Sequence, residues 1–158
     1  MKLIITGSPG TGKTTLAKKI AKKYKLTYFN EKDFALKNKI GSFNEENELE
    51  IPIGAFEKKA NVFLTSHKNV VFEGHVLCEM KLRVDKVFLL TLDPEELEMR
   101  LENRGYSMEK LMDNVFCEGI DYCKKHVYRN YSEKKVFLLR SYPSEATTFK
   151  QACLLVKP

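Results

Sequence analysis

The sequence predicts an α/β fold in which a parallel five-stranded sheet is flanked by helices, and three observations point to it. Short runs that are apolar throughout recur along the chain. Segments with helical periodicity fill the gaps between these runs, as expected when crossover helices join parallel strands. The chain has 158 residues, 43% of them apolar and 30% charged, which suits a single globular domain over 1–158.

Five runs are predicted to be strands because they lack the polar alternation of a strand that is exposed on one face. The stronger candidates are KLIIT, NVVFE, KVFLLTL and KVFLL, at 2–6, 69–73, 86–92 and 135–139. The run LTYFN, at 26–30, is the weaker fifth. Together they indicate a sheet that is covered on both faces.

Caps and apolar spacing predict the helices between these strands. The first helix begins within the glycine-rich segment that follows the first strand, and the second spans about 53–67. A third starts with Asp93 as N-cap and Pro94 at its first position, and we expect it to end near Gly105.

Ser107 can cap a further helix, which we expect to run to about Tyr128. Two stretches fit the overall pattern poorly, namely the polar segment 38–51 and the short link at about 104–107. Both are candidates for moving parts.

The most specific motif is GSPGTGKTT, at 7–15, because Gly7, Gly12, Lys13 and Thr14 satisfy the phosphate-loop pattern G-x-x-x-x-G-K-[ST]. The glycines let backbone N–H groups turn inward around an anion, and the N-terminal end of the following helix adds positive potential. The lysine supplies a charge for the β- and γ-phosphates, and the threonine hydroxyl suits Mg²⁺. We therefore expect ATP and Mg²⁺ at this loop.

A carboxylate, Glu73, ends the predicted strand in the run VVFEGH. A charge is costly inside a buried sheet and belongs at a strand end, and such a carboxylate commonly holds the Mg²⁺ shell in proteins with this loop. We assign Glu73 to Mg²⁺, directly or through water. Gly74 permits a sharp turn, after which His75 would face the phosphate loop and orient an acceptor phosphate or a water. A purely structural histidine is the alternative.

Arg100 and Arg104 lie four residues apart in RLENRGY and therefore on one helix face. Such a pair can reach over transferring phosphates, where positive charge stabilises the transition state. The alternative is a surface face that pairs with Glu96 and Glu102. Because Arg104 precedes Gly105 at a helix end, it also resembles a hinge.

The net charge of +6 favours an anionic partner only weakly. Much of it comes from KKIAKKYK, at 18–25, whose lysines fall outside an apolar helix face and fit a solvated surface. No apolar run reaches the roughly 18 residues of a membrane span, and no signal peptide is evident, so an intracellular protein is expected. The cysteines lack metal-binding CxxC spacing and are expected to be reduced core residues, with a disulfide or zinc less favoured; they are Cys78, Cys117, Cys123 and Cys153.

Four segments together resemble the family of adenylate kinase isoenzyme 6, a small nuclear adenylate kinase and ATPase linked to maturation of the small ribosomal subunit. They are GSPGTGKTT, NEKDFA, VVFEGH and RLENRGYSMEKLMDNVFCE, which follow in order within about 1–125. The resemblance implies an adenylate-kinase-like P-loop fold with strand order 2-3-1-4-5. It also implies an AMP-binding arm at about 30–60 and a short lid at about 104–116.

The same resemblance assigns individual residues. Glu73 stands where many members have an aspartate, His75 matches the histidine that follows it, and Arg104 matches the lid arginine at the nucleotide. Asp33 and Lys37 fall in the AMP arm, beside a leucine where relatives can carry arginine. The family's ATP-binding loop matches Gly10, Thr11, Gly12, Lys13, Thr14 and Thr15.

The resemblance implies an enzyme that converts ATP and AMP to two ADP, with slower ATPase activity. It implies a monomer that acts in small-subunit ribosome assembly, in the nucleus or cytoplasm, with a small-subunit ribosomal protein and pre-ribosomal RNA as partners. Two alternatives stay open, an ATP-driven assembly protein with vestigial kinase activity and a kinase for another small acceptor. The acidic segment FNEENELE, at 43–50, offers either a contact for a basic partner or a solvated loop.

Overall fold

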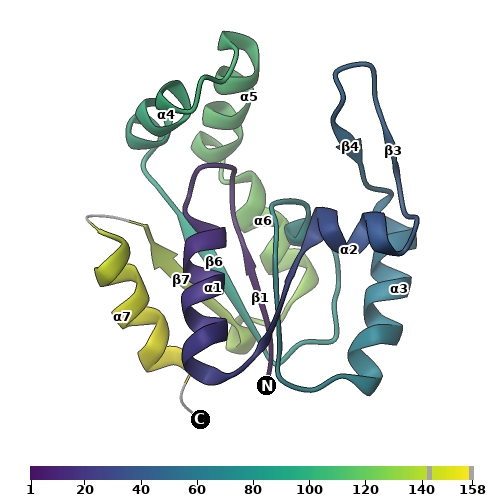
Figure 1. Ribbon diagram of the computed structural model, residues 1–158. Coiled ribbons are helices and arrows are strands. Elements are labelled where there is room, and N and C mark those ends of the chain that lie inside the picture. Colours follow the sequence, from purple (N-terminus) through teal and green to yellow (C-terminus); the bar gives the residue numbers. More distant parts are fainter. Residues whose placement is uncertain (142–143, 157–158) are drawn as a thin grey trace.

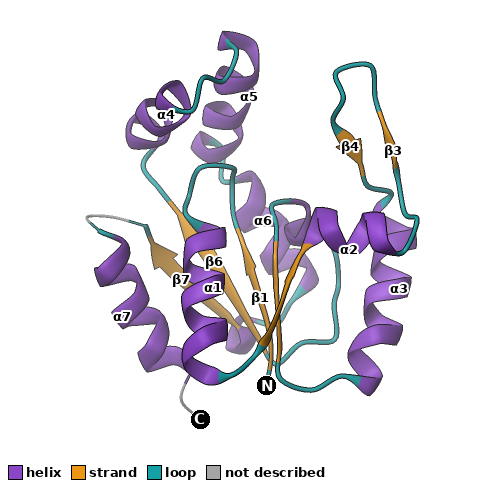
Figure 2. Ribbon diagram, viewed as in Figure 1, coloured by secondary structure: helices purple, strands orange, loops and turns teal. Residues whose placement is uncertain are grey.

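The computed structural model describes residues 1–141 and 144–156, and its centre is a parallel sheet of five strands (Figures 1 and 2). The strands lie in the order β2-β5-β1-β6-β7, and all neighbouring pairs are parallel. Counted along the chain within this sheet, this is the expected order 2-3-1-4-5, so the predicted fold class is confirmed. The bounds are Lys2–Thr6 for β1, Thr27–Asn30 for β2, Val70–Glu73 for β5, Lys86–Thr91 for β6 and Val136–Arg140 for β7.

Helices cover both faces of the sheet and bury a separate core on each (Figure 1). Because alternate strand residues point to opposite faces, Ile4 packs in one core, whereas Leu3 and Ile5 pack in the other. This two-sided burial explains why the strands are apolar throughout. One core contains α1 (Lys13–Tyr24) and α7 (Glu145–Val156), and the other contains α2 (Glu31–Lys37), α3 (Ile53–Ser66) and α6 (Tyr122–Asn130).

A third, smaller core joins two helices above the sheet, namely α4 (Pro94–Asn103) and α5 (Met108–Gly119). Leu97 and Leu101 of α4 are fully buried against Leu111 of α5. The two helices therefore form one packed pair near the glycine-rich loop.

The prediction that one helix runs from Ser107 to about Tyr128 is wrong. Ser107 caps α5 as expected, accepting a hydrogen bond from the Lys110 backbone N–H, but α5 ends at Gly119 and α6 begins at Tyr122. Asp121 between them has a left-handed φ of 56°. The turn is needed because α5 packs on α4, whereas α6 packs on the sheet, and one straight helix cannot serve both surfaces.

Asp93 is the N-cap residue of α4, and Pro94 opens the helix as expected. The carboxylate of Asp93 makes no capping hydrogen bond and pairs with Arg140 at the end of β7. The expected helix end is confirmed, because α4 stops at Asn103 and Gly105 has a φ of 72°.

Several elements were not anticipated from the sequence. The polar segment 38–51 contains a short antiparallel hairpin, in which Ser42 pairs with Glu50. The additional elements are α2, α7, the hairpin strands β3 (Ser42–Phe43) and β4 (Leu49–Glu50), and the 3-10 turns Val76–Glu79 and Glu133–Lys135.

None of the helices in the described part of the chain is both long and apolar enough to cross a membrane. All four cysteines are free, and Cys78, Cys123 and Cys153 are buried.

Candidate nucleotide-binding site

The loop between β1 and α1 owes its shape to its glycines. Gly7, Gly10 and Gly12 have φ values of 145°, 88° and 89°, which residues with a side chain rarely adopt. A Cβ on Gly10 would lie 2.9 Å from the side chains of Leu97 and Leu101. The glycines thus allow both the curvature of the loop and its close contact with α4.

The side chain of Lys13 turns back over this loop, and its Nζ donates a hydrogen bond to the Ser8 carbonyl oxygen at 2.8 Å. The residue is only 8% exposed. Burial lowers the pKa of the ammonium group, and the negative charges of Glu31 and Glu73 oppose this shift. An anion held by the loop would further stabilise the charged form of this lysine.

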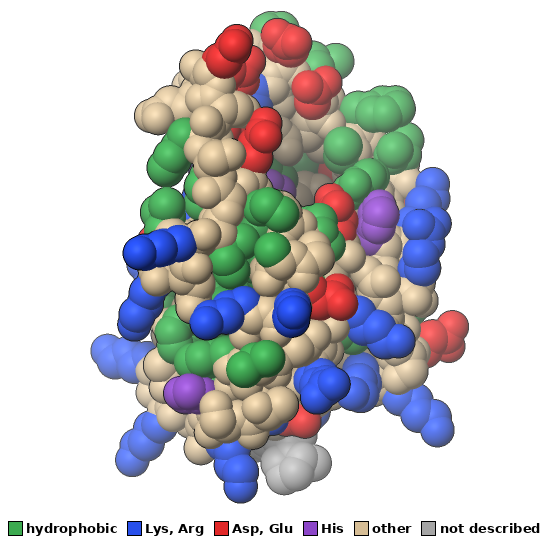
Figure 3. Space-filling model, turned by 90° about the vertical axis from the view of Figure 1, so that its right-hand side faces the viewer, with side chains coloured by type: hydrophobic (Ala, Val, Ile, Leu, Met, Phe, Trp, Pro, Cys, Tyr) green, Lys and Arg blue, Asp and Glu red, His purple; other side chains and the backbone are tan. Residues whose placement is uncertain are grey.

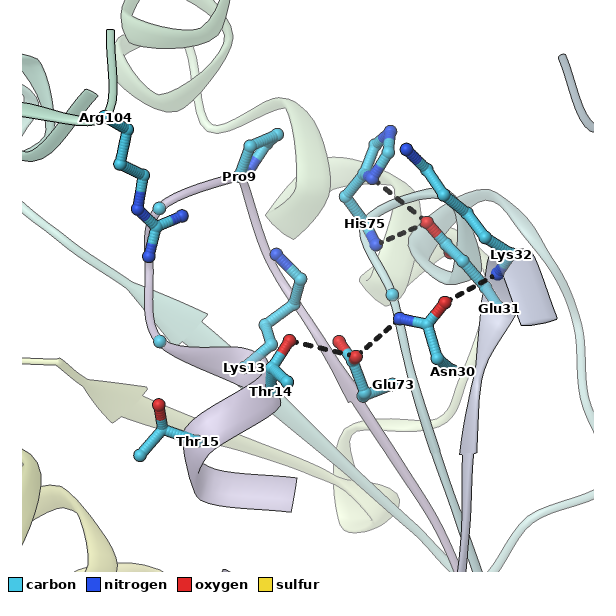
Figure 4. Close-up of a pocket in the computed structure, with 13 residues that line it drawn as sticks. Pro9, Lys13, Thr14, Thr15, Asn30, Glu31, Lys32, Glu73, His75 and Arg104 are labelled. Carbon is cyan, nitrogen blue, oxygen red and sulfur yellow. Dashed lines mark hydrogen bonds and ion pairs between the residues drawn. The ribbon is translucent and has the colours of Figure 1, made fainter. Parts of the chain in front are cut away.

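A cavity of about 180 Å³ opens beside the loop at the carboxyl ends of β2 and β5 (Figure 4). Ligands of parallel α/β sheets bind at this edge. The walls come from the loop, the β2–α2 junction, the end of β5 and the end of α4. The lining residues are Pro9, Gly10, Gly12, Lys13, Thr14, Thr15, Asn30, Glu31, Lys32, Glu73, Gly74, His75 and Arg104.

Most residues expected at the nucleotide therefore line one cavity. The expected residues that do not line it are Thr11, Asp33, Lys37 and Arg100. Thr11 lies within the loop, where its hydroxyl donates to the Ser8 carbonyl at 2.8 Å and its own carbonyl accepts from Ser141 Oγ at 2.5 Å. Asp33 and Lys37 are exposed and are not among the lining residues. The catalytic or binding role of each residue stays a prediction.

Glu73 is the most enclosed acid of the cavity, with 1% of its surface exposed. Its Oε1 accepts hydrogen bonds from Thr14 Oγ1 at 3.0 Å, Tyr28 OH at 2.8 Å and Asn30 Nδ2 at 2.6 Å. Burial, followed by the hydrogen bond to Glu73, raises the pKa of Tyr28, so this phenol remains a donor. The carboxylate is thereby held directly beside the Thr14 hydroxyl.

This donor set suits Mg²⁺, which prefers one or two protein oxygens and completes its shell with phosphates and water. Among the described residues, no cluster of three or more His, Cys, Asp or Glu side chains could hold a metal by itself. Glu73 and Thr14 would therefore hold Mg²⁺ only together with a bound nucleotide, either directly or through water.

A second buried carboxylate, Glu31, stands on the opposite wall, and its side chain is 2% exposed. Oε1 accepts from the His75 backbone N–H at 3.1 Å and lies 3.0 Å from His75 Nδ1. Oε2 accepts from the Val76 backbone N–H at 3.0 Å. The acid thus fastens the turn after β5 to the start of α2 (Figure 4).

The two arginines expected to act together occupy different positions. Arg104, the C-cap residue of α4, lines the cavity of Lys13 and also a neighbouring cavity beside Glu145. Arg100 lines the neighbouring cavity but not the cavity of Lys13. Its guanidinium donates to the Ser141 carbonyl at 2.9 Å and to the Gly10 carbonyl at 3.4 Å. Arg100 therefore supports the loop, and its contact with transferring phosphates stays a prediction.

Glu118 of α5 was missed by the sequence reasoning and braces the loop from another side. Its Oε2 accepts from Ser8 Oγ at 2.5 Å, and its Oε1 accepts from the Leu92 backbone N–H at 3.0 Å. A helix of the expected lid is thus bonded to the phosphate loop. No local pattern signals this contact, because Glu118 lies 110 positions from Ser8.

Asn30, Glu31 and Lys32 were also missed, although one signal was available. Asn is a preferred N-cap residue, and Asn30 Oδ1 does accept from the Lys32 backbone N–H at 2.9 Å. Recognising this cap would have placed a helix start at the carboxyl end of β2, next to the cavity.

The hairpin and α5 are joined by an ion pair between Glu48 and Lys110. The hydrogen bond to Lys110 lowers the pKa of Glu48, and the same bond raises the pKa of Lys110. Both side chains are more than 40% exposed, so this bridge is expected to add at most about 1 kcal/mol.

Comparisons with known proteins agree with this architecture. Residues 3–142 match the family model described as "AAA domain". Curated relatives named "Putative adenylate kinase" include that of Thermococcus kodakarensis, 40% identical over 77% of this chain and 66% of the relative. The Pyrococcus furiosus protein is 40% identical over 77% and 65%, and that of Methanocaldococcus jannaschii is 33% identical over 78% and 70%. The matched region thus spans slightly less than two thirds of the first two relatives.

Two solved structures share the fold at low sequence identity. A gluconokinase from Sinorhizobium meliloti superposes with a TM-score of 0.63 at 13% identity, covering 96% of this chain and 88% of that one. A deoxyadenosine kinase from M. mycoides with bound dATP superposes with a TM-score of 0.60 at 18% identity, with 99% of each chain covered. At these identities the likeness concerns the fold alone.

Proposed function

The chain belongs to the AAA domain family and to the adenylate kinase-like family of its curated relatives, and on this premise we propose that it transfers the γ-phosphoryl group of ATP to AMP, giving two ADP. A slower hydrolysis of ATP would accompany the transfer. The observation that carries the proposal is the single cavity where Lys13, the Thr14–Glu73 pair and Arg104 face a second polar wall at the β2–α2 junction.

The loop side of the cavity supplies what a phosphoryl donor requires. Backbone N–H groups and the N-terminal end of α1 would hold the phosphates of ATP, with Lys13 close to the transferred group. Mg²⁺ held at Thr14 and Glu73 would neutralise charge on the β- and γ-phosphates. Arg104, at the boundary of two cavities that both include Gly10 and Gly12, would add positive charge as the phosphoryl group moves.

The opposite wall would receive the acceptor. Lys32 and His75 line it, whereas Asp33 and Lys37, the residues expected at AMP, are exposed outside the cavity. We therefore propose Lys32 as a cationic contact for the acceptor phosphate and retain Asp33 and Lys37 only for a closed arm. Lysine is a point charge and a looser phosphate clamp than arginine, so AMP binding should be weak.

The direct test compares two reactions of one protein preparation. ADP formation from ATP plus AMP measures phosphoryl transfer, and phosphate release from ATP alone measures hydrolysis. AMP-dependent ADP formation well above hydrolysis supports the proposal. Hydrolysis alone supports an ATP-driven protein with vestigial kinase activity, and transfer only to a different acceptor supports a kinase for that acceptor.

Replacing His75 with glycine is expected to lower turnover more than ATP affinity. The histidine lines the cavity at the end of β5, whereas ATP would be held mainly by the loop. A positioned acid–base group contributes about 10²–10⁴-fold, so we expect kcat to fall at least about tenfold, with the KM for ATP nearly unchanged. Steady-state kinetics will measure kcat and the KM for ATP. Comparable losses of turnover and of ATP affinity would show that His75 is a binding or folding residue.

Replacing the two arginines separately should give different results. Arg104→Ala should lower kcat by about 10²-fold, because it removes a positive charge from the reacting group, and should leave the free energy of unfolding nearly unchanged. Arg100→Ala should destabilise the protein by about 1–3 kcal/mol, because it removes donors from two backbone carbonyls. Kinetics and chemical denaturation of both variants distinguish the roles, and identical profiles would contradict them.

A second candidate function is ATP-driven assembly of the small ribosomal subunit, with a small-subunit ribosomal protein or pre-ribosomal RNA as partner. The observation that favours it is that the acceptor side of the cavity contains neither Leu36, which is 49% exposed, nor Lys37. In this alternative, hydrolysis would drive a change of shape, and a nuclear or cytoplasmic location would follow the partner.

The hairpin offers such a partner an acidic surface. In Figure 3, acidic side chains gather at the upper end of the face, the end that carries the hairpin in Figure 1, whereas Lys and Arg dominate lower down. Glu48 is already paired with Lys110, which leaves Glu45, Glu46 and Glu50 as the tested acids.

Reversing the charge of these three acids should weaken capture of a basic small-subunit ribosomal protein at least about tenfold and leave ATP binding unchanged, since surface charge acts on association. Pull-down at fixed salt will measure this effect, with Glu133→Lys as the control for charge placed elsewhere. Equal recovery by the reversed and native proteins would rule out the hairpin as the contact.

A further inference from the structure

We propose that Glu31 is a positioning residue that fixes the ring of His75, so that Nδ1 faces the carboxylate and Nε2 serves the cavity as a hydrogen-bond acceptor for water. This inference rests on the proposed ATP-dependent function of the cavity. It separates two roles that the sequence left open for His75, the orientation of an acceptor phosphate and the orientation of a water.

In the neutral ring, the contacts of Glu31 determine which nitrogen of His75 carries the proton. An ionised carboxylate can only accept hydrogen bonds. Because Oε1 lies 3.0 Å from Nδ1 of His75, that contact requires a proton on Nδ1. In the neutral ring the proton is then absent from Nε2, which keeps its lone pair. The backbone N–H groups of His75 and Val76 hold the same carboxylate in place.

The surrounding structure gives Glu31 little room to move. A Cβ on Gly74 would lie 1.9 Å from Oε2 of Glu31, so the carboxylate packs against the backbone where only glycine leaves space. Glu31 is the first residue of α2. This helix is anchored in the core by Phe34, whose ring centroid lies 5.0 Å from that of Phe72. The acid is therefore fixed both by its bonds and by its helix.

The resulting histidine suits water better than a phosphate. His75 lines the cavity with Lys13, and its side chain is 47% exposed (Figure 4). In the neutral ring, Nε2 accepts a hydrogen bond from water but has no proton to donate to a phosphate oxygen. In hydrolysis, the water oxygen forms the new bond to the γ-phosphorus, ADP leaves with the electrons of the broken P–O bond, and the water proton passes to Nε2.

Nitrogen NMR tests the tautomer without reference to activity. Long-range ¹H–¹⁵N spectra of the full chain, at a pH where the ring is neutral, should show His75 protonated on Nδ1, with His75→Ala identifying the signals. Glu31→Gln leaves one acceptor oxygen for three donors and should weaken this preference, while His126 keeps its own signals. A proton on Nε2 in the native protein, or no response to Glu31→Gln, would overturn the inference.

Kinetics then tests whether the orientation matters. Glu31→Gln should lower kcat for phosphate release about tenfold or more and change the KM for ATP little. The same substitution in a His75→Ala protein should cause no further loss. Glu57→Gln is the matched control, because Glu57 also accepts from a backbone N–H, that of Lys81 at 2.8 Å, away from the cavity; kcat should be unchanged.

The outcomes separate this inference from the proposed function. A native protein that neither releases phosphate nor makes ADP would contradict the proposed function, and the NMR result would still decide the role of Glu31. If the native protein is active and Glu31→Gln lowers kcat by the same factor with and without His75, Glu31 only holds the backbone, and the inference is wrong.

Discussion

Replacing Lys13 with alanine is expected to lower both phosphoryl transfer and ATP hydrolysis by about 10³-fold in a protein that still folds. The Lys13 ammonium lies in the loop, 2.8 Å from the Ser8 carbonyl oxygen, where it would meet the phosphates of ATP. Loss of one such electrostatic contact to a reacting group costs about 10²–10³-fold in kcat. The loss here should be at the upper end, because Lys13 is the only lysine of the phosphate-loop motif.

Folding should survive because burial disfavours the charged form of this lysine, as its lowered pKa indicates. Lys22→Ala is the matched control, since Lys22 is an exposed lysine of the same helix, and it should retain full activity. Circular dichroism, calorimetric ATP binding and coupled assays of both variants will measure these effects. Near-normal turnover by folded Lys13→Ala protein would remove the loop from the mechanism.

Replacing Gly74 with alanine should cause a large loss of stability from a single methyl group. The added Cβ would lie 1.9 Å from Oε2 of Glu31, and this buried carboxylate would have to leave the backbone N–H groups of His75 and Val76. A buried donor left without a partner costs about 1–3 kcal/mol. We therefore expect a loss of about 3 kcal/mol, equivalent to a fall in Tm of roughly 6–12 °C.

Two further variants identify the cause of this loss. In a Glu31→Ala protein the obstructing side chain is gone, so Gly74→Ala should then cost less than about 0.5 kcal/mol. Gly54→Ala in α3 is the control, because a Cβ there has nothing within 4 Å, and it should be neutral or stabilise by about 0.5–1 kcal/mol. Denaturation curves that give the same cost with and without Glu31 would contradict this explanation.

The phosphate loop and the five strands could be predicted because their determinants are contiguous. Gly10 and Gly12 set the φ values of their own backbone, and an apolar run such as KLIIT is selected by burial on both faces. The five-stranded order 2-3-1-4-5 followed from the resemblance and not from any property of the strands themselves.

Helical spacing predicted that Arg100 and Arg104 lie on one helix face, and both line the cavity beside Glu145, but the spacing did not determine what each side chain contacts. That depends on how α4 sits on the loop, where Leu97 and Leu101 pack against Gly10. This packing brings Arg100 to the carbonyl of Gly10 and leaves Arg104 at the cavity. The spacing of residues along a helix predicts which face they share. What they contact also depends on where the neighbouring element lies.

The contacts that hold the acceptor wall and brace the phosphate loop join distant segments of the chain. Glu31 meets the backbone of His75 across 44 positions, and Ser8 meets Glu118 across 110. The break between α5 and α6 has the same origin, because two different surfaces compete for one stretch of chain. Local residue patterns were sufficient for the phosphate loop, since a short segment encodes its own backbone conformation. Only tertiary packing decided which carboxylate holds His75, because that contact exists only once α2 and the end of β5 are brought together in the folded sheet.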